Sequence, residues 1–95
     1  MRRVVITGMG IVSSIGNNVA EVTKSLRESR SGITASSDMT ENGFRSRVHG
    51  MPSIDVTEHV DKRNLRFMGT GAAYNFIAME QAIADSGLEE SDVSN

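Results

Sequence analysis

Residues that could act as nucleophiles, general bases or metal ligands are scarce in this chain of 95 residues. It contains no cysteine, and its two histidines, His49 and His59, each lie in or beside a polar segment. A metal site needs more ligands than one histidine pair supplies. We expect the hydroxyls of Ser13 and Ser14 to form hydrogen bonds within a loop rather than to act as nucleophiles. We therefore predict no catalytic residue, no metal and no cofactor in this chain.

A glycine-rich loop follows the first apolar run, and such loops can bind phosphates. The Gly-Met-Gly at 8–10 begins like the G-x-G-x-x-G pattern of dinucleotide-binding proteins, but the third position is Ser13. The next helical pattern starts near Val19, too far along the chain to place a helix N-terminus against a pyrophosphate. A P-loop would need Gly-Lys followed by Ser or Thr. We interpret the glycines at 8, 10 and 16 instead as residues that let the chain turn sharply beneath its neighbours.

Three cations, Lys62, Arg63 and Arg66, follow Asp61, which can cap one short helical turn. Lys62 and Arg66 are i, i+4 neighbours, and Arg63 and Arg66 are i, i+3 neighbours, so one turn can present all three. We call these three cations the basic turn. Two of them would sit in the first turn of a helix, where positive charge is locally unfavourable. The basic turn is either a solvated charge cluster or a binding surface for an acidic partner.

The charge of the chain is divided unevenly. All ten Lys and Arg residues fall within residues 1–66, beside seven acids, whereas residues 67–95 hold five acids and no base. This split is too mild for a nucleic-acid-binding surface. No stretch approaches the roughly 20 apolar residues that span a bilayer, and the N-terminus leads into a short β-branched run rather than a signal-type helix. We predict a cytoplasmic protein with no nucleic-acid partner and no membrane partner.

Three elements can be predicted from patterns in the first half of the chain. Residues 4–7 are apolar and β-branched without alternation, which predicts a central strand buried on both faces, as in a parallel sheet. Asn18 and Glu21 form a capping-box-like pattern at the start of an amphipathic helix that ends at residues 30–32. The alternation of residues 44–50 predicts a strand with one solvated face.

The longest helix is predicted from about Thr70 to Ser86, with Gly87 as its C-terminal cap. Its apolar residues cover a wide face, so we expect it to be mostly buried, with Met79 as a core filler. This helix and the strand at 4–7 need neighbours that the remaining residues do not supply. The predicted fold class is α/β, and residues 1–95 are expected to be part of a larger domain rather than an autonomous one.

Several segments, in the same order, resemble the N-terminal signature of the β-ketoacyl-acyl-carrier-protein synthases, which belong to the thiolase-like superfamily. The resemblance is carried by VVITGMGIVSSIGN at 4–17, Glu21, Leu26, RSGI at 30–33, DKR at 61–63, RFM at 66–68 and MEQAIADSGL at 79–88. Type II members typically have a proline in the serine loop and an Asp after the RFM-like segment. This chain has neither, so it is similar to the type I enzymes. The resemblance covers essentially the whole chain but only about the first quarter of a family member.

This resemblance implies a five-layered α-β-α-β-α fold of two similar halves. Residues 1–95 would be its N-terminal piece, with a strand, a helix, a cap-like excursion and a long buried helix. It also implies an obligate homodimer and a decarboxylative Claisen condensation in fatty-acid elongation. In that reaction a cysteine takes the acyl chain from a carrier-protein thioester, and two histidines assist the decarboxylation of malonyl carrier protein. Because this chain has no cysteine and its histidines match neither catalytic motif, the 95 residues alone are expected to be inactive.

The resemblance also gives the basic turn a role. In the family, basic residues around the active-site entrance receive the acidic helix of acyl carrier protein, and Lys62, Arg63 and Arg66 match that region. The implied partners are therefore acyl carrier protein, the remainder of the same polypeptide and a second subunit. Two alternatives stay open for the function. One is a non-catalytic homologue of the chain-length-factor type, and the other is a module that only binds carrier protein.

Overall fold

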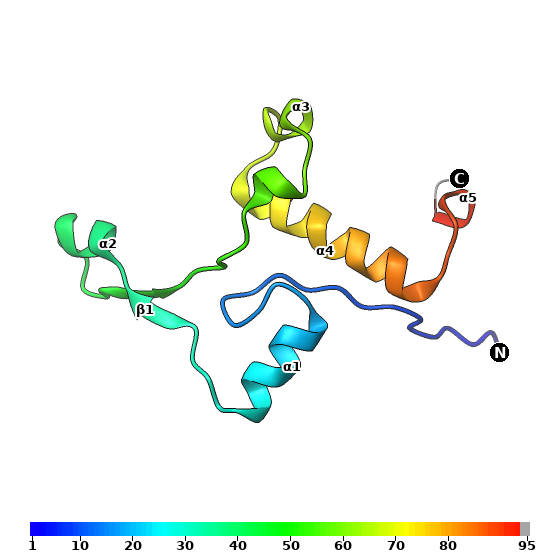
Figure 1. Cartoon of the computed structure of the whole chain (residues 1–95), viewed down its shortest axis with the longest axis horizontal. Coiled ribbons are helices and arrows are strands. Elements are labelled where there is room, and N and C mark those ends of the chain that lie inside the picture. Colours follow the sequence, from blue (N-terminus) through cyan, green and yellow to red (C-terminus); the bar gives the residue numbers. More distant parts are fainter. Residues whose placement is uncertain (94–95) are drawn as a thin grey trace. The chain divides into compact units, whose positions relative to one another are not determined.

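The computed structural model describes residues 1–93, which form several helices and one two-stranded sheet (Figure 1). The elements are α1 (Val19–Arg27), β1 (Ile33–Ala35), α2 (Ser37–Glu41), β2 (Val48–Gly50), the 3-10 helix η1 (Val56–Glu58), α3 (Lys62–Leu65), α4 (Thr70–Ser86) and α5 (Glu90–Val93). Contacts divide the chain into a middle unit, Ser13–Ile54, and a terminal unit, which joins Met1–Val12 to the described residues from Asp55 onward. This mixture is compatible with an α/β protein.

In the middle unit, α1 begins at Val19, as the capping pattern predicts. The side-chain oxygen of Asn18 accepts the backbone N–H of Glu21 at 2.9 Å, and the Glu21 carboxylate accepts the backbone N–H of Asn17 at 3.2 Å. These two bonds satisfy donors that a helix start otherwise leaves unpaired. The helix ends at Arg27, earlier than predicted, because Ser29 already adopts a left-handed conformation with φ of 55°.

The sheet of the middle unit pairs β1 with β2 in antiparallel fashion. Its register places Ile33 opposite Gly50, Thr34 opposite His49 and Ala35 opposite Val48. The prediction of a strand over residues 44–50 is therefore correct only for its last three residues. The earlier part has no strand partner because the chain across from it turns into α2, which Ser36 caps by accepting the N–H of Met39 at 3.3 Å. The sequence pattern did not predict β1 or α2.

In the terminal unit, the predicted central strand at residues 4–7 is not formed. The structure assigns no strand there, and the exposed fractions of Val4, Val5 and Ile6 are 94%, 70% and 86%. A strand needs hydrogen bonds from a neighbouring strand, and none of the described residues provides one for this segment. The segment therefore has strand-like composition without a sheet.

The glycines at 8 and 10 have a different role from the predicted sharp turn. Neither has a positive φ, a property that the structure assigns to Gly43 and Gly87. A Cβ atom added at Gly8 would overlap the carbonyl oxygen of Ala82, and one added at Gly10 would overlap that of Ala78. These glycines therefore allow the N-terminal segment to approach the backbone of α4. Gly16 is tight in the same way against the start of α1, where an added Cβ would lie 2.7 Å from the Val22 nitrogen.

The helix α4 has the predicted bounds, and Gly87 ends it in a left-handed conformation with φ of 72°. Its burial is lower than predicted. Ala73 and Ile77 are buried, and with Val60 they form the apolar core of the described residues, but Met79 is 61% exposed rather than a core filler. The reason is that few described elements pack against this helix, mainly η1 and the N-terminal segment.

Candidate functional site

The basic turn is built on α3, whose start is fixed by Asp61. The Asp61 carboxylate accepts the backbone N–H of Arg63 at 3.1 Å, and its carbonyl accepts the N–H groups of Asn64 and Leu65 at 2.9 and 3.0 Å. Leu65, in the turn, and Met68, shortly after it, are half-buried. The predicted Asp61 cap is therefore confirmed, and it orients a single helical turn.

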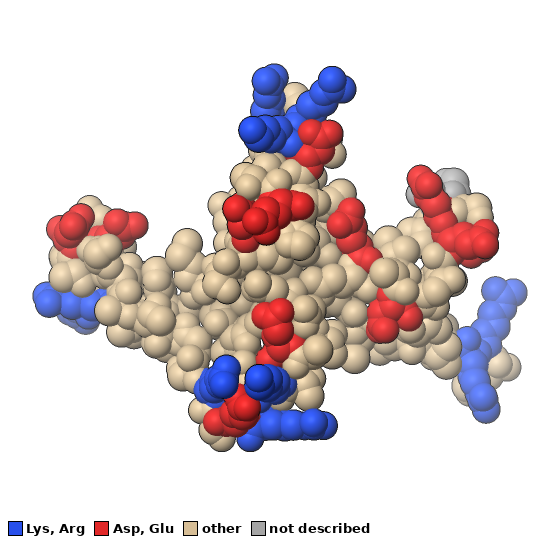
Figure 2. Space-filling model, viewed as in Figure 1, with Lys and Arg blue, Asp and Glu red and all other residues tan. Residues whose placement is uncertain are grey.

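The three cations of the basic turn are all exposed. Figure 2 shows Lys and Arg side chains gathered over α3, next to an acidic side chain. Across residues 1–93, none of them has an ion-pair partner. Cations that are close together, solvated and unpaired produce a local positive potential that an acidic partner can use.

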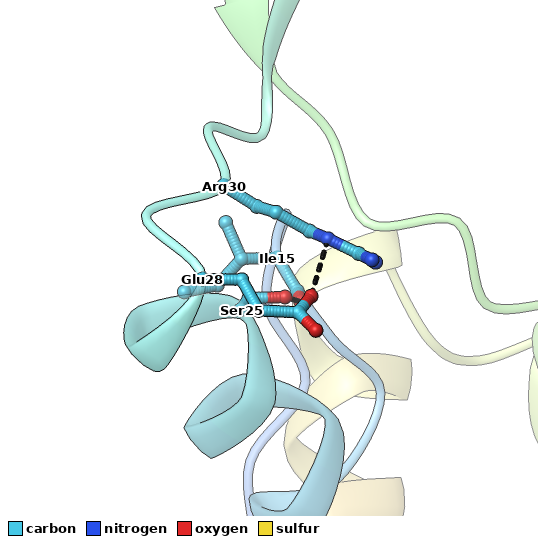
Figure 3. A network of polar contacts seen from close by, with 4 residues as sticks. All are labelled: Ile15, Ser25, Glu28 and Arg30. Atoms are coloured by element: carbon cyan, nitrogen blue, oxygen red, sulfur yellow. Dashed lines mark hydrogen bonds and ion pairs between the residues drawn. The ribbon is translucent and has the colours of Figure 1, made fainter.

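An arginine of the middle unit provides a contrast. The Arg30 Nε atom lies 2.7 Å from a carboxylate oxygen of Glu28, while nearby the buried Ser25 hydroxyl donates to the Ile15 carbonyl at 2.6 Å (Figure 3). The charge of Arg30 is thus compensated within its own turn. Within residues 1–93, no ion pair compensates the cations of the basic turn in this way.

Two acids near the basic turn in sequence are used as helix caps. Asp55 caps η1 and accepts from the Thr57 hydroxyl at 2.6 Å and from the Thr57 backbone N–H at 3.0 Å. These hydrogen bonds, with a smaller effect of His59, lower the pKa of Asp55 from its ordinary value. Asp61 caps α3 in the same manner. Both carboxylates therefore accept backbone N–H groups, and neither forms an ion pair with the basic turn.

Phe67 is a feature of the site that the sequence reasoning missed. It directly follows Arg66, and its side chain is 90% exposed. The signal that could have indicated it is a large aromatic residue beside three cations in a turn with little room for a core. The basic turn is thus followed by one exposed aromatic side chain, and aromatic residues and arginine are both enriched in protein–protein interfaces.

The other candidate residues do not gather into a chemical centre. His49 lies on β2 and His59 follows η1, so they belong to different units. Among the described residues, no group of three or more His, Cys, Asp or Glu side chains is arranged to hold a metal. The Ser13 hydroxyl accepts the backbone N–H of Ile15 at 3.3 Å and takes part in the loop that closes on Gly16, as expected. No described helix is both long and apolar enough to cross a membrane.

The described residues therefore include an exposed cationic turn, and their mixture of helices and a small sheet is compatible with an α/β fragment. All of residues 1–95 match the N-terminal domain of β-ketoacyl synthases, and the chain belongs to that family. The chain is 53% identical over its full length to 3-oxoacyl-[acyl-carrier-protein] synthase 1 of Escherichia coli strain K12, and it covers 23% of that protein.

Two further relatives support the same family and its type I branch. The synthase 1 of Haemophilus influenzae is 50% identical over the whole chain, which again covers 23% of the relative. A relative named synthase 2, from Vibrio harveyi, is 40% identical over 89 residues, or 93% of this chain and 21% of the relative. The resemblance to type I enzymes is thus confirmed. The chain spans about a quarter of the length of the relatives it matches.

Proposed function

We propose that these residues are the N-terminal part of a 3-oxoacyl-[acyl-carrier-protein] synthase that elongates fatty acids. The observation that carries this proposal is the 53% identity to the Escherichia coli enzyme over the whole chain. In the proposed reaction a cysteine thiolate attacks an acyl thioester and releases the carrier-protein thiol. Malonyl carrier protein then loses carbon dioxide, and the resulting enolate attacks the acyl-enzyme, which forms the new carbon–carbon bond and expels the thiolate. The names of the relatives support a condensing enzyme over a non-catalytic homologue.

In this proposal the described residues serve as scaffold. Residues 1–95 contain no cysteine, so the nucleophile would come from another part of the enzyme. The exposed segment at 4–7 and the exposed face of α4 would then be covered by later elements of a five-layered thiolase-like fold. We extend the proposal to a cytoplasmic homodimer, the state that the family resemblance implies.

The basic turn would be the part of this chain that contacts acyl carrier protein. Its exposure and its lack of ion pairs among the described residues support this role. An acidic helix placed opposite three cations gains from each contact, and exposed charge pairs are worth about 0.2–1 kcal/mol each. Such contacts mainly accelerate and orient the encounter. Single substitutions would therefore have small effects, and reversal of all three charges a clear one.

A chimaera tests both parts of the proposal. Residues 1–95 would replace the matching first 23% of the Escherichia coli synthase 1, and the product would be assayed for condensation of acyl and malonyl carrier protein. We expect the chimaera to be active. Lys62→Glu, Arg63→Glu and Arg66→Glu together should raise the KM for carrier-protein substrates by about threefold to a hundredfold, as three exposed contacts would predict.

Two controls separate docking from damage to the enzyme. An acyl-pantetheine substrate has no acidic helix, so its turnover should not change in the triple variant. Reversal of Lys24 and Arg27, two exposed cations near the end of α1, should leave the KM for carrier protein unchanged. An inactive chimaera that is nevertheless folded would contradict the enzyme assignment. An active chimaera whose KM does not respond to the triple reversal would contradict the docking role alone.

A further inference from the structure

The N-terminal segment is held along α4 by two backbone N–H groups that lie two residues apart. The N–H of Met9 donates to a carboxylate oxygen of Asp85 at 3.0 Å, and the N–H of Ile11 donates to the side-chain oxygen of Gln81 at 3.1 Å. Figure 1 shows this segment as an open trace without helical coils, running beside α4. The two acceptors are i, i+4 neighbours on the helix and therefore lie on one face.

The glycines of the same segment alternate with these donors. An added Cβ at Gly8 would overlap the Ala82 carbonyl oxygen and lie 2.6 Å from the Ser86 nitrogen. At Gly10 it would overlap the Ala78 carbonyl oxygen and lie 2.8 Å from the Ala82 nitrogen. The atoms that each glycine approaches are also spaced by four residues along α4. The contacts therefore recur every two residues along the segment and every four residues along α4.

These two contact spacings correspond to nearly the same distance along the segment and along the helix. Two residues of an extended chain rise about 6.4–6.8 Å. Four residues of an α-helix rise about 6.0 Å. We infer that Gln81 and Asp85 are positioning residues that, with Gly8 and Gly10, hold the N-terminal segment along α4 in one antiparallel register.

Other registers are excluded by side chains. A shift by one residue would place Met9, together with either Thr7 or Ile11, where the glycines now meet the helix backbone. A shift by two would place either Ile6 or Val12 at a glycine position. The Cβ atom of any of these residues would overlap a backbone carbonyl of α4, which a helix cannot move without breaking its own hydrogen bonds.

The same geometry explains where the contact stops. The next step of the pattern toward the N-terminus would pair residue 7 with residue 89, but α4 ends at Ser86 and Gly87 turns the chain away. Residues before Gly8 therefore have no further turn of α4 to follow, and Val4 and Ile6 are almost fully exposed. The length of the helix sets the length of the held segment.

Amide hydrogen exchange in the chimaera with the Escherichia coli synthase 1 tests this inference at single residues. Asp85→Ala should accelerate exchange at Met9, and Gln81→Ala should accelerate exchange at Ile11, each by about threefold to tenfold, the range that one hydrogen bond supports. Asp85→Asn and Gln81→Glu keep an acceptor oxygen and should largely restore the slow exchange. Glu80→Ala, an exposed position on the same helix, is the matched control and should change neither amide.

The pattern of responses distinguishes a positioning role from a general loss of stability. A register set by these two side chains predicts separate effects, one amide for each acceptor, with no change at Ser36 in the middle unit. Equal acceleration of both amides by either substitution would overturn the inference. Fast exchange at Met9 and Ile11 in the unsubstituted, folded chimaera would also overturn it. Neither outcome bears on the proposed docking role of the basic turn.

Discussion

The helix α4 and the segment at residues 4–7 are the two most apolar stretches of the terminal unit, yet only the helix forms the predicted element. A helix makes its hydrogen bonds within itself, so Thr70–Ser86 needs no other part of the chain to be regular. A strand must take its hydrogen bonds from a neighbour, and the described residues give the segment none. The difference between these two regions therefore lies in whether the element can form its backbone hydrogen bonds by itself.

In both regions, however, apolar side chains are left exposed. Met79 on α4 is 61% exposed, and Val4 in the segment is 94% exposed. Exposed apolar surface of this kind is typical of a face that another element covers. The comparison predicts that a longer protein would change the segment far more than the helix.

Val5→Pro should have the largest effect on stability, and this effect should differ between the 95-residue chain and the chimaera. In the 95-residue chain the Val5 amide has no strand partner, so the free energy of unfolding should change by less than about 0.5 kcal/mol. In the chimaera with the Escherichia coli synthase, a proline in a central strand would remove a hydrogen bond of the sheet and should cost about 3 kcal/mol or prevent folding.

Thermal melting of both pairs of proteins measures this difference, and Val5→Ala controls for the loss of the side chain alone. Small and equal effects of the proline in both contexts would mean that residues 4–7 do not enter a sheet in the longer protein. That result would remove the main support for placing this segment at the centre of a thiolase-like fold.

Alanine substitutions at two glycines should have intermediate effects of opposite sign on the free energy of unfolding. Gly10→Ala adds a methyl group against the α4 backbone and should destabilise the chain by about 1–3 kcal/mol. Gly71→Ala lies within α4, where no atom is within 4 Å of the added Cβ, and should stabilise it by about 0.4–1 kcal/mol. Urea unfolding followed by circular dichroism measures both midpoints. If Gly10→Ala has no effect, the N-terminal segment does not lie against the helix in solution.

The smallest effect concerns Asp55, whose cap on η1 is local and should not depend on the rest of the protein. Its folded-state pKa is below the ordinary value of 3.8, because Thr57 donates two hydrogen bonds to the carboxylate. The stabilisation is thus fully present above the unfolded pKa and is lost as the pH falls through the lower folded pKa. Asp55→Asn should therefore weaken the fall in stability below about pH 4. The free energy of unfolding of both proteins would be measured between pH 2 and 6. An equal loss of stability in the two proteins would contradict this prediction.

The sequence predicted best what short-range chemistry determines. Asn18 and Asp61 cap the helices that follow them, and Gly87 ends α4, because each acts on residues within a few positions of itself. The pairing of Ile33 with Gly50 was missed, since register depends on contacts across the intervening helix α2. For the candidate site, the clustering of the basic turn followed from helical spacing. The exposure of Phe67 did not, because it depends on what packs against it.

The contact between Met9 and Asp85 also has a consequence for the time at which the chain can order itself during synthesis. These residues are 76 positions apart, whereas the contacts of the middle unit are complete by Ile54. At a translation rate of about 5–20 residues per second, the N-terminal segment waits about 4–15 seconds for its helix to be made. Throughout that interval the N–H groups of Met9 and Ile11 lack their acceptors on α4, so the register of the segment can be set only late in synthesis.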